Sequence, residues 1–203
     1  HIAKVRWATS LGGDGPLDRR ILHEMDSYGG GWMRPHYAKD SPCATTIYPQ
    51  MRLEPLMKET LEKTGPGRLM FGYELGSLEQ NVDEVRSLIK NRATSETISV
   101  RSKYLIAADA GKTVGPIVGS VLRGTPELVD MVTVYFKADL SKYIDDEHVM
   151  TIWFGNTHGD TSSWGSGVLG KLGPKHFGKH SEEWIFHFSF PPDDSGKYDA
   201  TVL

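Results

Sequence analysis

Three side chains in apolar stretches of the sequence could donate a hydrogen bond to a substrate. They are Tyr135, Trp153 and His187, and each alternates with bulky apolar neighbours. Alternation of this kind is typical of strands whose two faces differ. One such donor, aimed at a carbonyl that gains charge in a dry site, stabilises a transition state by on the order of 3 kcal/mol. We therefore take these three as candidate catalytic residues, with a hydrogen-bonded sheet histidine as the alternative for His187.

A second group of candidates follows a run of three glycines, residues 29–31. It lies in the long segment 11–41, which we expect to be irregular apart from one short helix over 18–25. Large amphipathic side chains on such a loop are typical of a lid over an apolar ligand. The alternative is a loop that buries its tryptophan in the core. The candidate substrate-binding residues are Trp32, Met33, His36 and Tyr37.

The elements that must position these residues are mostly strands. Residues 50–63 form the one clear helix, because apolar side chains recur at helical spacing and Gly65-Pro66 ends the pattern. Residues 183–190 alternate four aromatic side chains with smaller ones, and the aromatics predict a core under a sheet. The pattern predicts a single α+β domain over residues 1–203, with a large, mostly antiparallel sheet and few helices. The predicted strands are 4–10, 43–48, 68–73, 82–89, 97–100, 103–107, 128–138, 149–154 and 183–190.

One segment suggests a nucleotide cofactor. In residues 103–113 an apolar stretch leads to Asp109, and a basic residue and a hydroxyl follow. This resembles the Y-L-(I/V)-G-A-D-G-x-(R/K)-(S/T) segment of flavin-dependent aromatic hydroxylases of the p-hydroxybenzoate and phenol hydroxylase type. Residues 41–56, with a Pro-Gln pair and an L-E-P-L helix, resemble the same family upstream, and residues 136–141 and 190–194 resemble later landmarks. The likeness is collinear from about residue 5 to residue 194.

The resemblance implies a substrate domain whose sheet forms the floor of a pocket, with the flavin ring as its lid. By position, Gln50 matches the family glutamine that reaches the flavin, and Asp109 matches the aspartate on the FAD ribose side. Lys112 and Thr113 stand for the usual Arg-Ser pair. Ala110 departs from the family glycine, and we expect its β-carbon to crowd a closely approaching cofactor.

The family's N-terminal G-x-G-x-x-G turn and its C-terminal G-D segment are not found in the sequence. The one matching string, residues 165–170, precedes Gly173-Pro174 and predicts a glycine-rich hairpin rather than a dinucleotide site. We therefore expect no cofactor, and interpret Gln50, Asp109, Lys112 and Thr113 as vestigial. The alternative for Asp109 is a cap on the following helix.

The composition and charge of the chain argue against several classes of binding partner. The chain has 203 residues and a formal net charge of −3, with its basic residues scattered, which disfavours nucleic acid. No apolar run approaches the length of a membrane span. A single cysteine, Cys43, and no N-x-(S/T) sequon favour a cytoplasmic protein. The pair His176 and His180 has no third ligand at a plausible spacing, so no metal is expected.

Three functions remain open at this point. The first is a flavin-free enzyme derived from such a monooxygenase, which cyclises an apolar terpenoid or polyketide intermediate by a pericyclic, Diels–Alder-type reaction, because folding a flexible substrate lowers a barrier without a cofactor. The second is a fragment or degenerate middle domain of an FAD-dependent aromatic hydroxylase, which a first residue other than methionine favours. The third is a non-catalytic binder of an apolar small molecule. The substrate and the oligomeric state stay open.

Overall fold

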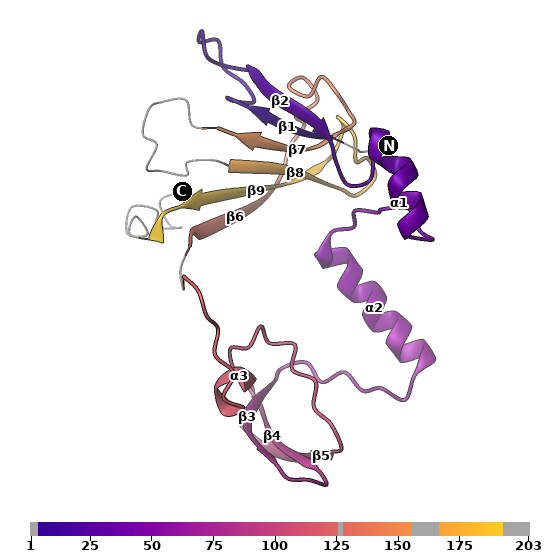
Figure 1. Cartoon of the computed structure of the whole chain (residues 1–203), viewed down its shortest axis with the longest axis vertical. Coiled ribbons are helices and arrows are strands. Elements are labelled where there is room, and N and C mark those ends of the chain that lie inside the picture. Colours follow the sequence, from indigo (N-terminus) through magenta and orange to yellow (C-terminus); the bar gives the residue numbers. More distant parts are fainter. Residues whose placement is uncertain (1–3, 126–127, 156–166, 193–203) are drawn as a thin grey trace. The chain divides into compact units, whose positions relative to one another are not determined.

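The chain contains two compact units. The computed structural model describes residues 4–125, 128–155 and 167–192. One unit comprises His1–Arg52 and Glu127–Leu203, and the other comprises Leu53–Pro126. Each unit has its own sheet (Figure 1). The prediction of a single domain over residues 1–203 stays a prediction.

The first unit is built on a six-stranded sheet with the order β2-β1-β7-β8-β9-β6. Strands β1 and β7 are parallel, and every other neighbouring pair is antiparallel. The predicted α+β class with a mostly antiparallel sheet is therefore confirmed. The strands are β1 Lys4–Ala8, β2 Ile21–Asp26, β6 Asp130–Lys137, β7 Val149–Phe154, β8 Gly167–Gly173 and β9 Glu183–Phe190.

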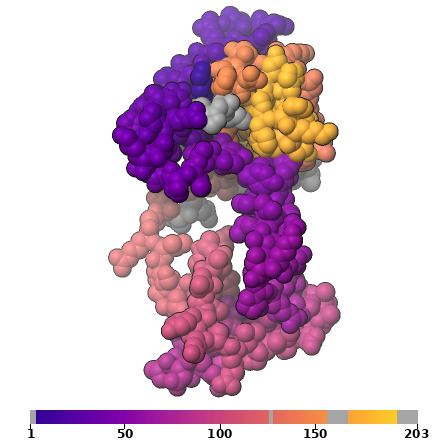
Figure 2. Space-filling model, turned by 90° about the vertical axis from the view of Figure 1, so that its right-hand side faces the viewer, coloured from indigo at the N-terminus to yellow at the C-terminus, as the bar shows by residue number. Residues whose placement is uncertain are grey.

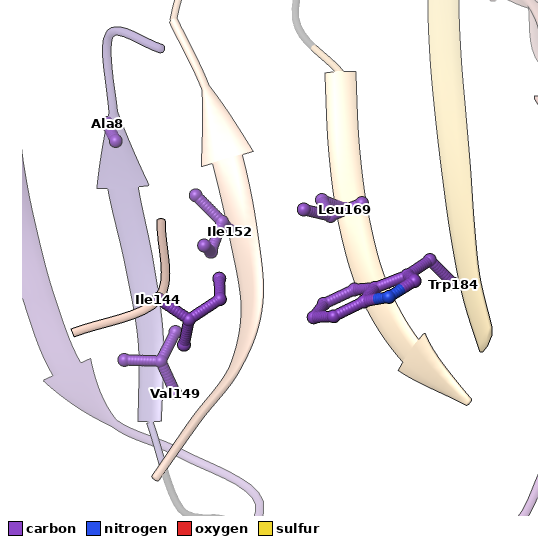
Figure 3. Close-up of a cluster of buried hydrophobic side chains, with 6 residues drawn as sticks. All are labelled: Ala8, Ile144, Val149, Ile152, Leu169 and Trp184. Carbon is purple, nitrogen blue, oxygen red and sulfur yellow. The ribbon is translucent and has the colours of Figure 1, made fainter. Parts of the chain in front are cut away.

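The hydrophobic core lies on one face of this sheet, which we call the core face. Side chains from four strands meet there with Ile144, which follows β6 (Figure 3). Trp184 is 1% exposed and donates its indole N–H to the carbonyl of Ala138 at 2.9 Å, so the ring is both buried and hydrogen-bonded. The predicted aromatic core of residues 183–190 is thus confirmed at Trp184. The buried members of the cluster are Ala8, Ile144, Val149, Ile152, Leu169 and Trp184.

One local prediction in this unit is wrong, and another lies partly outside the described residues. Residues 18–25 were expected to be helical, but β2 occupies Ile21–Asp26 and pairs with β1. Pairing with a strand already formed outweighs weak helical spacing. The glycine-rich string 165–170 was expected to be a hairpin, and its described part lies within β8, which pairs antiparallel with β7 and β9. Small residues in a strand are tolerated here because its neighbours on both sides supply the bulk.

Short helices replace the irregular segment that we expected before the long helix. Gly31–Met33 forms the 3₁₀ helix η1, and Arg34–Asp40 forms α1, with a proline in its first turn where a fixed φ favours a helix. The predicted helix over 50–63 is confirmed as α2, Gln50–Thr64. The predicted strand over 43–48 has no regular structure. Within the described residues, no helix has both the length and the apolar character of a membrane span.

The start of α2 is tied to the six-stranded sheet. Arg52 donates to the carbonyl of Leu172 at 2.7 Å and forms an ion pair with the carboxylate of Glu183. Figure 2 shows the purple N-terminal segment beside the yellow C-terminal part, although the two are far apart in the sequence. The guanidinium therefore joins two chain segments within the first unit.

The second unit is a three-stranded antiparallel meander followed by one helical turn. Its strands are β3 Tyr73–Gln80, β4 Val85–Asn91 and β5 Thr97–Ser102, and the turn is α3, Val114–Ile117. The Asn91 side chain accepts the N–H groups of Ala93 and Thr94, which shapes the β4–β5 hairpin. Residues 103–107, predicted as a strand, have no regular structure.

Candidate functional site

The face of the six-stranded sheet opposite the core face, which we call the open face, carries the predicted donors. Partners in register point to the same side of a sheet. One cross-strand row therefore runs through all six strands on this face. The row consists of His23, Trp7, Trp153, Val168, His187 and Thr133, in the spatial order of the strands.

A second row lies beside the first. It contains Tyr135, so the structure brings all three predicted catalytic side chains to one face. Tyr135 is 44% exposed and Trp153 is 41% exposed, whereas His187 is half-buried. Whether these residues act on a substrate stays a prediction. The second row consists of Val5, Thr151, Gly170, Ile185 and Tyr135.

The imidazole of His187 is held by a hydrogen bond. Its Nδ1 lies 2.9 Å from the Oγ1 atom of Thr133, its cross-strand partner on β6. If Nδ1 carries the proton, Thr133 accepts it, and Nε2 then has a free lone pair. Thr133 could not be recognised from the sequence, because it lies 54 residues from His187 and only the register of β6 with β9 brings the two together.

One hydroxyl on the open face has no partner. The Oγ1 atom of Thr151 is buried, and no hydrogen bond to it is formed among the described residues. A buried hydroxyl left unpaired costs about 1–3 kcal/mol. Gly170, next to it in the same row, has no side chain to cover the sheet.

The core face carries a hollow of about 410 Å³ that differs in character from the open face. Its walls are almost entirely apolar, and the hydroxyls at its rim are already used, since those of Thr9 and Ser10 donate to carbonyls of Leu17 and Gly12. Such a surface can hold an apolar group but offers little to a reacting polar atom. Its apolar lining includes Leu11, Phe136, Leu140, Phe154, Leu169, Phe186 and Phe188.

The predicted substrate-binding residues do not form one cluster. Trp32 lies on η1 and is 68% exposed, and its ring packs edge-on against that of His36 at 6.0 Å between centroids. Met33 ends η1 and is half-buried. Tyr37, on α1, lines a separate cavity of about 560 Å³ together with Arg34. A binding role for the four residues stays a prediction.

In the second unit, Asp109 organises a tight turn. Its carboxylate accepts the backbone N–H groups of Gly111 at 3.1 Å, Thr113 at 2.7 Å and Val114 at 2.8 Å. The N–H groups of Val114 and Thr113 hold the pKa of this carboxyl below its usual range. The alternative of a helix cap thus describes what Asp109 does within the chain, since it satisfies the first N–H groups of α3.

The turn also fits the edge of a nucleotide. The carboxylate of Asp109 already accepts N–H groups from three residues of the turn. Ala110 adopts φ 54, a left-handed conformation that glycine adopts easily, so the turn keeps its shape despite the substitution. A β-carbon at Gly111 would meet nothing within 4 Å, so the turn is open on that side. Lys112 and Thr113 lie exposed in the same turn.

Gln50, the other residue that the resemblance assigns to a flavin, lies in the first unit. It is the first residue of α2, is exposed, and follows the buried Pro49.

The histidines outside the open face make local contacts. For example, the Nδ1 atom of His176 lies 2.7 Å from a carboxylate oxygen of Glu182. Among the described residues, no group of three histidine, cysteine or acidic side chains could hold a metal ion.

The sheet thus has one apolar face and one face of aromatic and hydrogen-bonding side chains, and the chain also carries an aspartate-capped turn. Residues 19–201 match the family model described as FAD binding domain. The chain belongs to that family.

Individual relatives agree with this assignment. The 2,4-dichlorophenol 6-monooxygenase of Cupriavidus pinatubonensis is 31% identical over 142 residues, which is 70% of this chain and 24% of that protein. Tetracenomycin B2 monooxygenase-dioxygenase of Streptomyces olivaceus is 30% identical over 117 residues, 57% of this chain and 22% of that protein. The crystal structure of the flavin-dependent monooxygenase PieE in complex with FAD and substrate superposes with a TM-score of 0.77 at 30% identity, over 94% of this chain and 31% of PieE. The chain spans less than a third of the length of these proteins.

Two predictions are corrected by this match. The hypothesis of a flavin-free cyclase is wrong, and so is the expectation of no cofactor, because the family is defined by FAD binding and the match includes Gln50 and the Asp109 turn. Both errors came from the weight given to the absence of the G-x-G-x-x-G motif. The chain covers less than a third of the length of its relatives, so this absence is not evidence against FAD binding. The expectation that the β-carbon of Ala110 crowds a closely approaching cofactor stays a prediction.

Proposed function

We propose that this chain forms the substrate sheet and one edge of the FAD site of an FAD-dependent monooxygenase that hydroxylates an aromatic substrate. The main support is the row on the open face, where two neighbouring tryptophans share a cross-strand row with a histidine held by a threonine. Relatives named 2,4-dichlorophenol 6-monooxygenase and putative polyketide hydroxylase support the reaction class.

The overall reaction determines which co-reactants the protein requires. One oxygen atom of O₂ enters an aromatic C–H bond, and the other leaves as water, which takes up two electrons and two protons. The protein therefore requires O₂ and a two-electron reductant, and bound FAD supplies the redox chemistry that links them. In the second unit, the turn at Asp109, Lys112 and Thr113 would contact FAD, and in the first unit the resemblance assigns Gln50 to the flavin.

The chain's own residues bind and orient the substrate. Trp153 offers an aromatic surface for a ring, and His187 offers Nε2 to a phenolic hydroxyl. In the tautomer that donates Nδ1–H to Thr133, Nε2 accepts the phenolic proton, and the ring becomes richer in electrons and easier to oxidise. Fixing the imidazole beforehand saves the cost of ordering it when substrate binds.

Substrate binding by this face can be measured directly. Phenol is titrated into the purified chain in a calorimeter, and His187→Ala is expected to weaken binding roughly tenfold, because a lost hydrogen bond of this kind is worth about 1.5 kcal/mol. His148→Ala is the matched control, since His148 is exposed and bonded to Asp146. Equal affinity of His187→Ala and the unmodified chain would refute the role of this face.

The FAD edge has its own test. FAD is titrated into the chain and its fluorescence is followed. We expect saturable quenching that Asp109→Ala weakens and His148→Ala does not, because Asp109 shapes the turn. Circular dichroism of Asp109→Ala establishes whether the variant is folded. Quenching identical in the two variants would exclude the Asp109 turn from the site.

A further inference from the structure

The cavity of about 560 Å³ beside α1 belongs to the first unit and lies apart from the open face. We call it the α1 cavity. Its volume is in the range of sites that bind small molecules. Among the described residues, it shares no lining residue with the two cross-strand rows or with the apolar hollow on the core face. Its walls come from the turn before η1, from α1, from residues 41–47 and from Phe177.

One face of α1 supplies the charge of this cavity. Arg34, Tyr37 and Ala38 have the spacing i, i+3 and i+4, so they lie on the same face of the helix, and all three line the cavity. In the described part of the chain, Arg34 is the only charged residue of the lining, and its guanidinium forms no hydrogen bond or ion pair. An unpaired cation on the wall of a cavity attracts an anion.

Another wall begins with an uncommon turn. Tyr28 and Gly29 both have a φ in the left-handed region, 54° and 71°. The N–H of Gly30 donates to the carbonyl of Ser27 at 2.9 Å and closes the turn. A bulky residue such as Tyr28 is rare in this conformation. Glycine is required next to it, because a β-carbon at Gly29 would lie 2.6 Å from the Cδ1 atom of Tyr37. The turn and α1 thus meet closely, with an aromatic side chain from each in the lining.

The rest of the lining is apolar or carries hydroxyl and thiol groups. The hydroxyl of Ser41 is already used, since it donates to the carbonyl of Cys43 at 3.0 Å. Within the residues that the structure describes, no acidic side chain lines the cavity, so an anion meets no like charge there. An inorganic ion would use only the guanidinium, whereas an organic anion would also cover the apolar walls. These apolar residues are Pro42, Ala44, Ile47 and Phe177.

We propose that the α1 cavity binds an organic carboxylate, whose charged group lies on Arg34 and whose compact apolar body fills the remaining space. The planar fork of a guanidinium matches the two oxygens of a carboxylate, which makes this pair directional as well as strong. The inference goes beyond the proposed function and does not depend on it. The carboxylate is bound at a second site and is not oxidised there, because the cavity is separate from the face that carries His187.

Three probes test the chemistry of the site by calorimetry on the 203-residue chain. They are adamantane-1-carboxylate, its neutral analogue adamantane-1-carboxamide, and inorganic phosphate. The two organic probes share one saturated body, so they offer no aromatic ring to the open face. We expect the carboxylate to bind roughly tenfold more tightly than either of the others, because only it combines a charge for Arg34 with an apolar body. Equal affinity for the carboxylate and the carboxamide, or tighter binding of phosphate, would overturn the proposal.

Cys43 reports whether the carboxylate occupies this cavity. It is the one cysteine of the sequence, is exposed and lines the cavity, so its alkylation by iodoacetamide is followed at a single thiol. At a ligand concentration about ten times the dissociation constant, roughly one cavity in ten is free, and we expect alkylation to slow roughly tenfold. Heat of binding without protection of Cys43 would place the carboxylate elsewhere and refute the assignment.

Variants of α1 separate charge from shape. Arg34→Gln is expected to weaken the carboxylate roughly tenfold and the carboxamide less than about twofold, because only the carboxylate loses a charge-assisted hydrogen bond. Lys39→Gln is the matched control, since Lys39 is exposed on the same helix and does not line the cavity. Ala38→Leu keeps Arg34 and fills part of the cavity, so it should weaken both organic probes, and it serves if Arg34→Gln fails to fold. Equal effects of Arg34→Gln and Lys39→Gln, or unchanged binding in Ala38→Leu, would contradict the proposal.

His187→Ala distinguishes this site from the proposed function. We expect the carboxylate to bind to this variant as to the unmodified chain, whatever the variant does to phenol. A parallel loss of both ligands would mean that the carboxylate binds on the open face, and it would remove the α1 cavity as the carboxylate site while leaving the proposed function in place.

Discussion

Lys171 carries an amino group into the core face of the sheet. Lys171 is 3% exposed, and its Nζ atom donates a hydrogen bond to the carbonyl of Glu147 at 3.3 Å. Burial lowers the pKa of Lys171 to about 8, from 10.5, although the carboxylates of Asp146 and Glu147 act in the opposite direction and Arg6 reinforces the decrease. The folded chain therefore holds this proton less tightly than the unfolded chain does.

This buried amine predicts a dependence of stability on pH. Between pH 8 and pH 10.5 the unfolded state binds more protons at this position, so the free energy of unfolding rises with pH across that window. The full gain for this group is about 3 kcal/mol. Urea titrations at pH 7.5, 9 and 10 measure it, and Lys171→Met should remove most of the dependence. A slope that persists in Lys171→Met must come from other groups.

At the scale of elements, the ion pair between Arg52 at the start of α2 and Glu183 on β9 is expected to contribute to the free energy of unfolding. Glu183 is 8% exposed, and Arg52 is its near partner, with the amine of Lys137 at 3.8 Å. Arg52→Met leaves this carboxylate poorly paired, and we expect the free energy of unfolding to decrease by about 2 kcal/mol.

Tryptophan fluorescence during urea unfolding checks this value, because Trp184 adjoins Glu183 in the sequence. Lys63→Met is the control, since Lys63 and Glu59 form an exposed pair within α2 that is worth about 0.5 kcal/mol or less. Equal losses in the two variants would mean that the Arg52 contact contributes no more than a surface pair.

Elements with strong alternation were predictable from the sequence, and elements defined by distant partners were not. Strands 149–154 and 183–190 were predicted with the bounds that the structure has. Residues 21–26 became a strand because β1 pairs with them, and local spacing contains no information about that partner. The helix over residues 50–63 followed from its own periodicity.

The same distinction applies to the site. Alternation placed Tyr135, Trp153 and His187 on the polar side of their own strands. It could not place Val168 and Gly170 between Trp153 and His187, because the order of strands in the sheet differs from their order in the sequence.

At the scale of the whole molecule, the two compact units make a prediction about cooperativity. All five tryptophans, residues 7, 32, 153, 164 and 184, belong to the first unit, so their fluorescence reports that unit alone. Val85→Ala removes buried volume from the second unit, and we expect it to lower the second unit's midpoint by circular dichroism while the tryptophan transition stays in place. Val149→Ala, at a fully buried site of the first unit, should shift the tryptophan transition. A shift of that transition in both variants would instead support the single domain predicted from the sequence.

The parallel pairing of β1 with β7 has a consequence for the nascent chain. Residues 53–126, which form the second unit, are synthesised between these two strands. The meander β3-β4-β5 joins only strands that are neighbours in sequence, so it can fold on the ribosome while β1 and β2 still lack their central partner. Strand β1 therefore has an unpaired edge during this interval, which invites association with other chains. Strands β8 and β9 are the last of the sheet to emerge, so the open face with His187 is completed only when synthesis of the sheet ends.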